Sequence, residues 1–86
     1  MDSFKIIEYP ASTEKSIRLM ESENKLIFIV NRKSTKKDIR KAIEEMFKVE
    51  VVDVSTSINA DGKKRAYVRF SAKNPAIDIA TQMGLM

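Results

Sequence analysis

The sequence contains no cysteine and no histidine. Without these residues the chain can form no disulfide, no thiolate or imidazole zinc site, no thiol nucleophile and no Ser-His-Asp triad. Most enzyme classes thereby lose their main reactive groups. We therefore predict that the protein is not an enzyme and uses no cofactor or metal. A small hydrolase is the weakest hypothesis, because no nucleophile–base pair supports it.

Long apolar runs are absent as well. The longest, Leu26 to Val30, is too short to cross a bilayer, and the N-terminus lacks the basic-then-apolar order of a signal peptide. No repeat or glycine- or proline-rich linker divides the 86 residues. We predict one soluble, intracellular domain over residues 1–86, without membrane insertion. Its core should be thin, because so short a chain buries only roughly 60–65% of its unfolded surface.

Positive charge is confined to two short stretches. Sixteen Lys and Arg oppose twelve Asp and Glu, for a net charge of +4. Residues 31–41 carry six basic residues and one acid, and residues 59–73 carry five basic residues and one acid. Subtracting their net charges, +5 and +4, leaves the other sixty residues at −5. Such segregation is expected of a face that binds a polyanion.

Hydrophobic periodicity predicts the element order β-α-β-α-β-β-α. Strands are expected at residues 4–8, 25–30, 49–58 and 64–71, and helices at residues 13–23, 35–47 and 74–83. This order predicts an α+β fold, a two-layer or three-layer sandwich around a small, mainly antiparallel sheet. The last two strands should form a hairpin, because residues 59–62 supply turn chemistry.

Local signals set the expected helix boundaries and buried sides. Ser12 or Thr13 should cap the first helix, Thr35 with Asp38 resembles a capping box, and Asn74 before a proline predicts the third helix start. The expected buried stripes are Ile17 and Met20, then Ile39, Ala42, Ile43, Met46 and Phe47, and finally Ala76, Ile79, Ala80 and Met83. The expected inner faces of the hairpin strands are Val52, Val54, Thr56 and Ile58, and Ala66, Val68 and Phe70.

The second hairpin strand should project Arg65, Tyr67 and Arg69 from one face. Guanidinium groups pair with phosphate in bidentate fashion, and a tyrosine between them can stack on a base or ribose. The alternative is a solvated face whose arginines pair with acids such as Asp53. The adjacent basic pair at residues 63–64 favours RNA binding over this alternative.

The other basic stretch, residues 32–37, places cations at the start of a helix, where backbone N–H groups and the helix dipole favour an anion. The alternative is a merely solubilising helix face. Two such stretches in one small domain indicate folded RNA as the partner. The predicted RNA-binding residues are Arg32, Lys33, Lys36, Lys37, Arg40, Lys63, Lys64, Arg65, Tyr67 and Arg69.

Residues 64–70, Lys-Arg-Ala-Tyr-Val-Arg-Phe, resemble the signature strand of the family of the twenty-third protein of the large ribosomal subunit. Phe70 stands where this family usually has leucine. Three further stretches resemble the family in the same order, at residues 7–15, 24–28 and 35–51. The resemblance spans residues 4–86.

The resemblance implies a structural protein of the cytoplasmic ribosome that binds large-subunit rRNA near the exit of the nascent-chain tunnel, beside neighbouring ribosomal proteins. Family members help to form a docking platform for chaperones, signal recognition particle and the translocation channel, and Glu14 matches the family's Thr/Ser-Glu-Lys glutamate as a docking residue. The short turn at residues 60–62 resembles the archaeal or eukaryal form, not the bacterial hairpin that enters the tunnel. An alternative from another class is a small basic protein–protein adaptor outside the ribosome.

Overall fold

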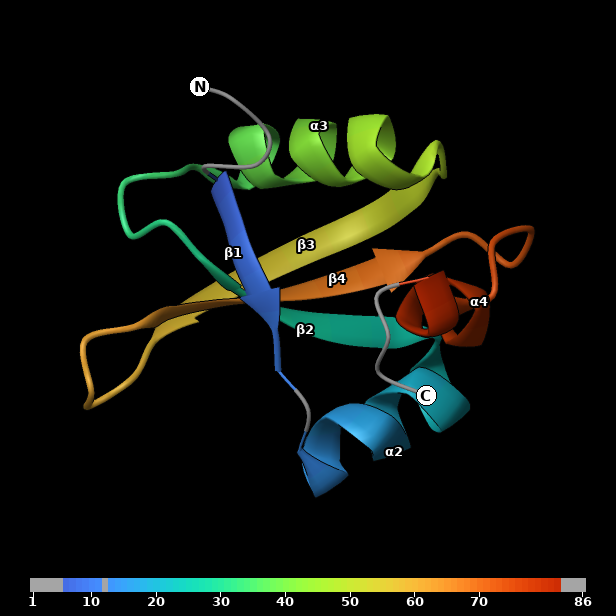
Figure 1. The fold of residues 1–86 in the computed structure, drawn as a ribbon, viewed down its shortest axis with the longest axis horizontal. Coiled ribbons are helices and arrows are strands. Elements are labelled where there is room, and N and C mark those ends of the chain that lie inside the picture. The colour runs from blue at the N-terminus through green and yellow to red at the C-terminus, as the bar shows by residue number, and fades with distance from the viewer. Residues whose placement is uncertain (1–5, 12, 83–86) are drawn as a thin grey trace.

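The computed structural model describes residues 6–11 and 13–82, which form a four-stranded antiparallel sheet with helices packed against it (Figure 1). The strands are β1 (Ile7–Pro10), β2 (Lys25–Val30), β3 (Val51–Ile58) and β4 (Lys64–Phe70), and the helices are α2 (Glu14–Glu23), α3 (Lys36–Phe47) and α4 (Ala76–Gln82). The strand order is β1-β2-β4-β3, so β1 and β3 form the edges. The predicted α+β fold and element order are confirmed.

Strand β2 occupies the centre of the sheet. Its residues Leu26 to Val30 are all buried, as their uninterrupted apolar run predicts. The register sets Leu26 opposite Val68 and Phe28 opposite Ala66, and side chains at paired positions point to the same side of a sheet. We call the side that carries Val68 the inner face and the opposite side the outer face.

The inner face forms the main core together with α3 and α4. The core includes Ile39, Ala42 and Ile43 of α3, Ala76, Ile79 and Ala80 of α4, Met20 of α2, and Leu26, Phe28, Val30, Val51, Val54, Ala66, Val68 and Phe70 of the strands. Met46 and Phe47 pack against this core and are only partly buried. The predicted stripes of both helices are thus confirmed as far as Ala80, and Met83 lies outside the described residues.

Helix α2 packs against β2 and α4, and Figure 1 shows it below β2, whereas α3 lies above β3. Met20 is buried, but Ile17 is 45% exposed, so the predicted stripe is wrong at Ile17. Ser16 is buried instead. Its hydroxyl donates to the Thr13 carbonyl oxygen at 2.8 Å and accepts from the Thr13 amide at 2.9 Å. The capping box satisfies the polar atoms of Ser16 locally, so this side chain can be buried.

Threonines cap α2 and α3 as predicted. Thr13 caps α2, and in α3 the Thr35 hydroxyl accepts from the Asp38 amide while the Asp38 carboxylate accepts from the Thr35 amide. The predicted Asn74 cap of α4 is wrong. The Asn74 side-chain oxygen accepts from the Glu50 amide at 2.9 Å, so it is engaged at the start of β3 and not at the helix.

Asn24 supplies the group that α4 needs. Its left-handed backbone, with φ 56°, ends α2, and its side-chain oxygen accepts from the Ala76 amide at 2.6 Å. Its side-chain nitrogen lies within hydrogen-bond distance of the carbonyl oxygens of Phe70, Ser71 and Asn74. One side chain therefore joins the end of α2 to the β4–α4 connection. Sequence periodicity carries no signal of such a contact.

Strand β1 is displaced from its predicted position. It runs over Ile7–Pro10 and not over residues 4–8, of which residues 4 and 5 lie outside the described part of the chain. Pro10 is tolerated at its end because β1 is an edge strand. The predicted edge position of this strand is confirmed.

A bulge corrects the predicted inner face of β3. The strand begins at Val51, and its register with β4 shifts between Val51 and Asp53. Val51 is therefore fully buried while Val52 is 52% exposed. Val54 is buried as predicted, but Ile58 at the far end of the strand is 54% exposed.

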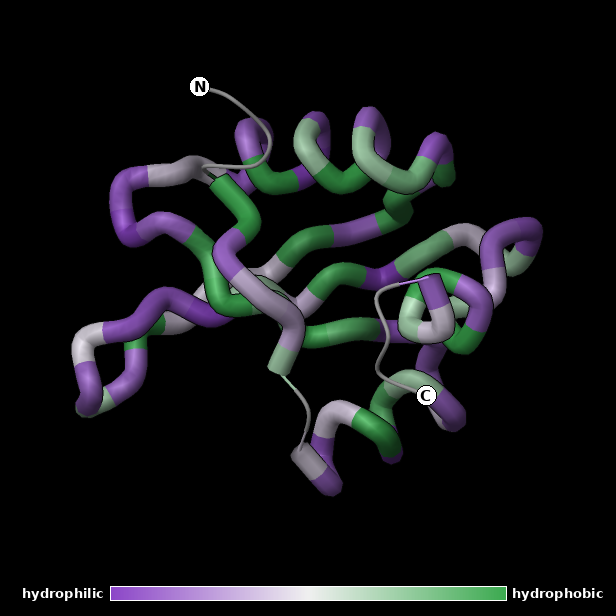
Figure 2. Tube along the Cα trace, viewed as in Figure 1, coloured by the Kyte–Doolittle hydropathy of each residue, from purple (hydrophilic) through white to green (hydrophobic). Residues whose placement is uncertain are grey.

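Two hydrophilic turns project from the same end of the sheet, as Figure 2 shows on the left of the view. They are the β2–α3 turn, residues 31–35, and the β3–β4 turn, residues 59–63. Val30 pairs with Lys64, which sets the end of β2 beside the start of β4. In the hairpin turn, Gly62 adopts φ +82° and its amide donates to the Asn59 carbonyl oxygen. Both basic stretches of the sequence therefore start at the same end of the sheet.

Candidate nucleic-acid interface

Strand β4 sorts its side chains between the two faces as predicted. Ala66 and Val68 are buried on the inner face. Arg65 and Tyr67 are half-buried and Arg69 is exposed, all on the outer face. The strand thus holds two guanidinium groups and a phenol ring in a row.

The neighbouring side chains on β3 are small. The register sets Ser55 beside Tyr67 and Ser57 beside Arg65. Both serines are exposed. Since a serine side chain rises little above the strand, the outer face over β3 and β4 forms an open, polar surface.

The outer face over β2 is covered instead. Ile27 and Ile29 lie on it and are 3% and 5% exposed. Strand β1 sets Tyr9 opposite Ile29. Helix α2 brings the Lys15 ammonium to 5.6 Å from the centre of the Tyr67 ring. β1 and α2 therefore border the open half of this face.

Lys63 connects the hairpin turn to β1. Its ammonium lies 2.9 Å from the Tyr9 hydroxyl oxygen and 5.6 Å from the Tyr9 ring centre. The 5.6 Å distance nearly equals the sum of two lengths, the 2.9 Å hydrogen bond and the distance from the centre of a tyrosine ring to its own hydroxyl oxygen. The ammonium therefore lies in line with the C–O bond and not over a ring face. The hydrogen bond with Tyr9 raises the pKa of Lys63, so the side chain stays charged.

The outer-face arginines are paired with no carboxylate in the part of the chain that the structure describes. Asp53 sits opposite Arg69 in the register, but its carboxylate accepts from the Val54 amide at 2.9 Å. The Asn59 carboxamide lies beside the Arg65 guanidinium, and turning its oxygen toward that group gives a 2.7 Å contact with Nε. A neutral amide orients a guanidinium without neutralising it, so both arginines keep their charge for an anion.

The other basic stretch lies in the β2–α3 turn and on the first half of α3. Its predicted site residues, Arg32, Lys33, Lys36, Lys37 and Arg40, are all exposed. A groove of about 200 Å³ separates this half of α3 from the edge strand β3. The groove is lined by Lys36, Lys37, Arg40, Val52, Asp53 and Val54.

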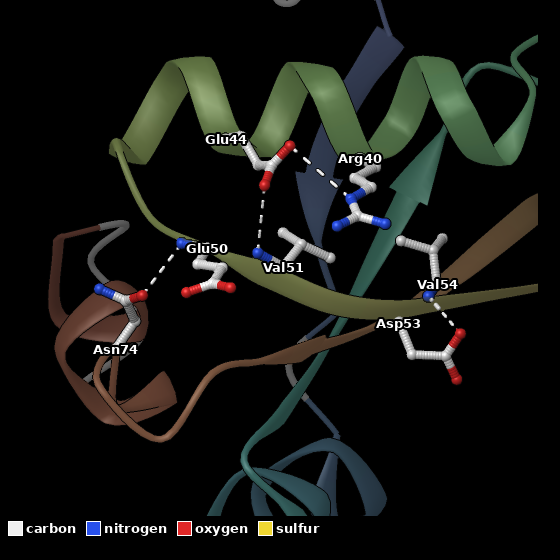
Figure 3. A network of polar contacts seen from close by, with 7 residues as sticks. All are labelled: Arg40, Glu44, Glu50, Val51, Asp53, Val54 and Asn74. Atoms are coloured by element: carbon white, nitrogen blue, oxygen red, sulfur yellow. Dashed lines mark hydrogen bonds and ion pairs between the residues drawn. The ribbon is translucent and has the colours of Figure 1, made fainter.

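Two carboxylates contact β3 next to this groove, Glu44 from α3 and Asp53 from the strand itself (Figure 3). Glu44 lies 3.7 Å from the Arg40 Nε and also accepts from the Val51 amide at 3.3 Å. The Asp53 carboxylate likewise accepts a hydrogen bond from the Val54 amide. These carboxylates satisfy amides along β3, which blunts pairing of this edge with another strand. They also offset part of the positive charge of the groove.

The N-terminus of α3 already holds an anion, the carboxylate of Asp38. The hydrogen bond from the Thr35 amide, followed by that of its hydroxyl, lowers the pKa of Asp38. The carboxylate is therefore ionised at neutral pH and meets the positive end of the helix dipole. This carboxylate competes with a phosphate for the helix end, so we expect lysine and arginine side chains to supply most phosphate contacts near this helix.

Lys64 points away from the outer face. It lies opposite Val30, and its ammonium donates to the carbonyl oxygen of Ser34, a residue that is 1% exposed. This bond joins the hairpin to the β2–α3 turn. It also directs the Lys64 charge inward, unlike the charges of its neighbours Lys63 and Arg65.

Apart from Lys64, the predicted site residues thus divide into two surfaces, one along the outer face of β4 and one on the β2–α3 turn and the first half of α3. We call Lys63, Arg65, Tyr67 and Arg69, with the bordering Tyr9 and Lys15, the sheet surface. We call Arg32, Lys33, Lys36, Lys37 and Arg40 the helix surface. Sequence reasoning missed Tyr9 and Lys15, because only the cross-strand register and the position of α2 bring them to this face.

Glu14 stands apart from the cations as the first residue of α2. Its carboxylate lies 2.8 Å from Arg18 Nη2, with side chains 82% and 77% exposed, respectively. An exposed pair of this kind contributes little to stability and exchanges partners readily. The carboxylate is therefore accessible to a docking cation.

Two further features of the described residues bear on function. No group of three or more potential metal-binding side chains occurs among residues 6–11 and 13–82. None of the helices in these ranges combines the length and apolar character needed to cross a bilayer.

Known proteins resemble the chain over nearly its whole length. The family model described as ribosomal protein L23 matches residues 5–81. Large ribosomal subunit protein uL23 from Methanococcus maripaludis strain C5 is 47% identical over 85 residues, covering 99% of each chain. Its counterpart from Methanococcus aeolicus is 41% identical over the same length and coverage. The chain therefore belongs to the ribosomal protein L23 family.

Proposed function

We propose that the protein is a structural, non-catalytic component of the cytoplasmic large ribosomal subunit, where it binds large-subunit rRNA and contacts neighbouring ribosomal proteins. One observation carries this proposal: Arg65, Tyr67 and Arg69 project from one open sheet face, and neither arginine is paired with a carboxylate among the described residues. The names of the relatives, large ribosomal subunit protein uL23, support it.

The sheet surface suits a phosphate backbone because its charges are presented by a rigid strand. Guanidinium groups bind phosphate oxygens in bidentate fashion, and the strand fixes their spacing before binding. The helix surface adds exposed cations near the end of the sheet where β4 begins. Most of the affinity should be electrostatic and should fall steeply with salt.

The proposal is tested by sedimentation of a native lysate through a sucrose gradient at high salt. We expect the protein to sediment with the large subunit after the salt wash. A pool that stays free of subunits would contradict the proposal. Competition between structured RNA and polyglutamate then tests the protein–protein adaptor, which predicts no preference for RNA.

The position on the ribosome is a finer part of the same proposal. We place the protein beside the exit of the nascent-chain tunnel, where α2 would face chaperones, signal recognition particle and the translocation channel. The short β3–β4 turn, residues 59–63, agrees with a protein that stays outside the tunnel. The exposed Glu14 is the proposed docking residue.

Replacement of Glu14 tests this position. In subunits that carry Glu14→Gln, binding of signal recognition particle should weaken while incorporation into the subunit stays normal. Glu21→Gln on the same helix is the matched control, because Glu21 is also an exposed acid. Equal effects of both variants would show that only the net charge of α2 matters.

A further inference from the structure

The two tyrosines of the chain, Tyr9 and Tyr67, both belong to the outer face of the sheet. Tyr9 pairs with Ile29, and Ile29 pairs with Arg65 in the next strand, so these side chains form one row across the sheet. Tyr67 pairs with Ile27 in the adjacent row. Two strand spacings and one two-residue step separate the tyrosine Cα atoms by about 12 Å.

Both rings can be reached from solvent. Tyr9 is 43% exposed, and its only contact with Lys63 lies beyond the hydroxyl, in line with the C–O bond. Tyr67 is half-buried next to the small side chain of Ser55. Lys15 lies over its ring. An exposed cation–π contact is weaker than a base–aromatic stack, so a base can displace this lysine.

The charges around the rings match a single nucleic-acid strand. Lys63 borders Tyr9, and Arg65 and Arg69 flank Tyr67 along β4. A tyrosine ring offers a stacking surface to every base, and the neighbouring cations can hold the connecting phosphates. A paired helix cannot use the rings, because its bases are already stacked on each other.

We propose that the sheet surface binds an unpaired RNA segment, with nucleobases stacked on Tyr9 and Tyr67 and phosphates held by Lys63, Arg65 and Arg69. This inference rests on the proposed rRNA binding and names the structural class of RNA that the face selects. The helix surface, which has cations but no aromatic ring, is left for backbone contacts alone.

The test uses the full chain labelled with 3-fluorotyrosine, which gives one fluorine resonance for each of the two tyrosines. Tyr9→Phe and Tyr67→Phe assign the resonances. Short oligoadenylate should move both resonances upfield, because a stacked base shields the ring. An RNA duplex and polyglutamate should leave both in place. Resonances that stay fixed while oligoadenylate binds, or that move equally with polyglutamate, overturn the inference.

Affinity gives an independent readout. Tyr9→Ala and Tyr67→Leu should each weaken oligoadenylate binding about tenfold and leave duplex binding unchanged. Ile77→Ala is the matched control, because Ile77 is an exposed apolar residue of α4, outside the sheet surface. Equal losses for oligoadenylate and duplex would also overturn the inference. Failure of the wild-type protein to bind any RNA, rRNA included, would instead contradict the proposed function.

Discussion

The sheet surface and the helix surface carry similar numbers of cations but hold them differently. Arg65 and Arg69 extend from a central part of the sheet, and no carboxylate is paired with either in the described chain. On the helix surface, Arg40 pairs with Glu44, and Asp53 lines the same groove. A count of charges along a sequence therefore does not measure the strength of a binding surface. Whether a neighbouring carboxylate pairs with a cation decides how strongly that cation can bind an anion.

Replacing the two arginines of the sheet surface should have the largest effect on RNA binding. We expect Arg65→Ala with Arg69→Ala to weaken binding of a large-subunit rRNA transcript about 100-fold at about 50 mM salt and to flatten the logarithmic salt slope by about two, since each arginine neutralises one phosphate. Filter binding over a salt series measures both quantities. An unchanged slope would show that RNA phosphates do not bind to this face.

The matched change on the helix surface should have a smaller effect. We expect Lys36→Ala with Lys37→Ala to cost about tenfold in affinity and about one in salt slope, because these lysines are flexible and Asp53 lines the same groove. The same salt series measures the change. A loss that equals or exceeds that of the arginine pair would reverse the order of the two surfaces.

Lys64 tests whether the bond between the two surfaces stabilises the fold or binds RNA. Its ammonium donates to the buried carbonyl group of Ser34, so Lys64→Met should lower the free energy of unfolding by about 1–2 kcal/mol in urea denaturation. The salt slope should stay unchanged. The exposed neighbour Lys63 should show the opposite, with Lys63→Met flattening the slope by about one at nearly unchanged stability. A flattened slope in Lys64→Met would return this lysine to the RNA-binding set.

The smallest effect concerns the anion that the helix surface already holds. Because the folded-state pKa of Asp38 is lowered below 3.8, its ionised form stabilises the fold above that pH, and this contribution is lost as the pH falls through the folded pKa. The Tm of the wild type should therefore exceed that of Asp38→Asn at neutral pH, and the gap should close at acidic pH. A gap that is constant from pH 7 to the acid limit would show that the carboxylate charge is irrelevant to the cap.

Local patterns predicted most of the fold, and non-local contacts account for the errors. The apolar run of β2, the alternation of β4 and the Thr35 capping box each lie within a short window of sequence, and each is confirmed. The bulge at Val52 depends on the pairing of β3 with β4. The cap of α4 comes from Asn24, 52 residues away.

The same distinction between local patterns and non-local contacts holds for the candidate site. Alternation along β4 was enough to predict that Arg65, Tyr67 and Arg69 share a face. The inward turn of Lys64 depends on the position of Ser34, 30 residues away. Tyr9 joins this face through the register of β1 with β2. Local periodicity gives the face of a residue within its element, but the partner across the fold decides its role.

The central claim is that the sheet surface meets RNA in the ribosome. Arginine-directed chemical modification of the free protein and of isolated large subunits, read by mass spectrometry, tests it directly. We predict that Arg65 and Arg69 become protected in the subunit, while the exposed Arg18 on α2 stays reactive in the absence of docking factors. Reactive Arg65 and Arg69 together with a protected Arg18 would contradict the account.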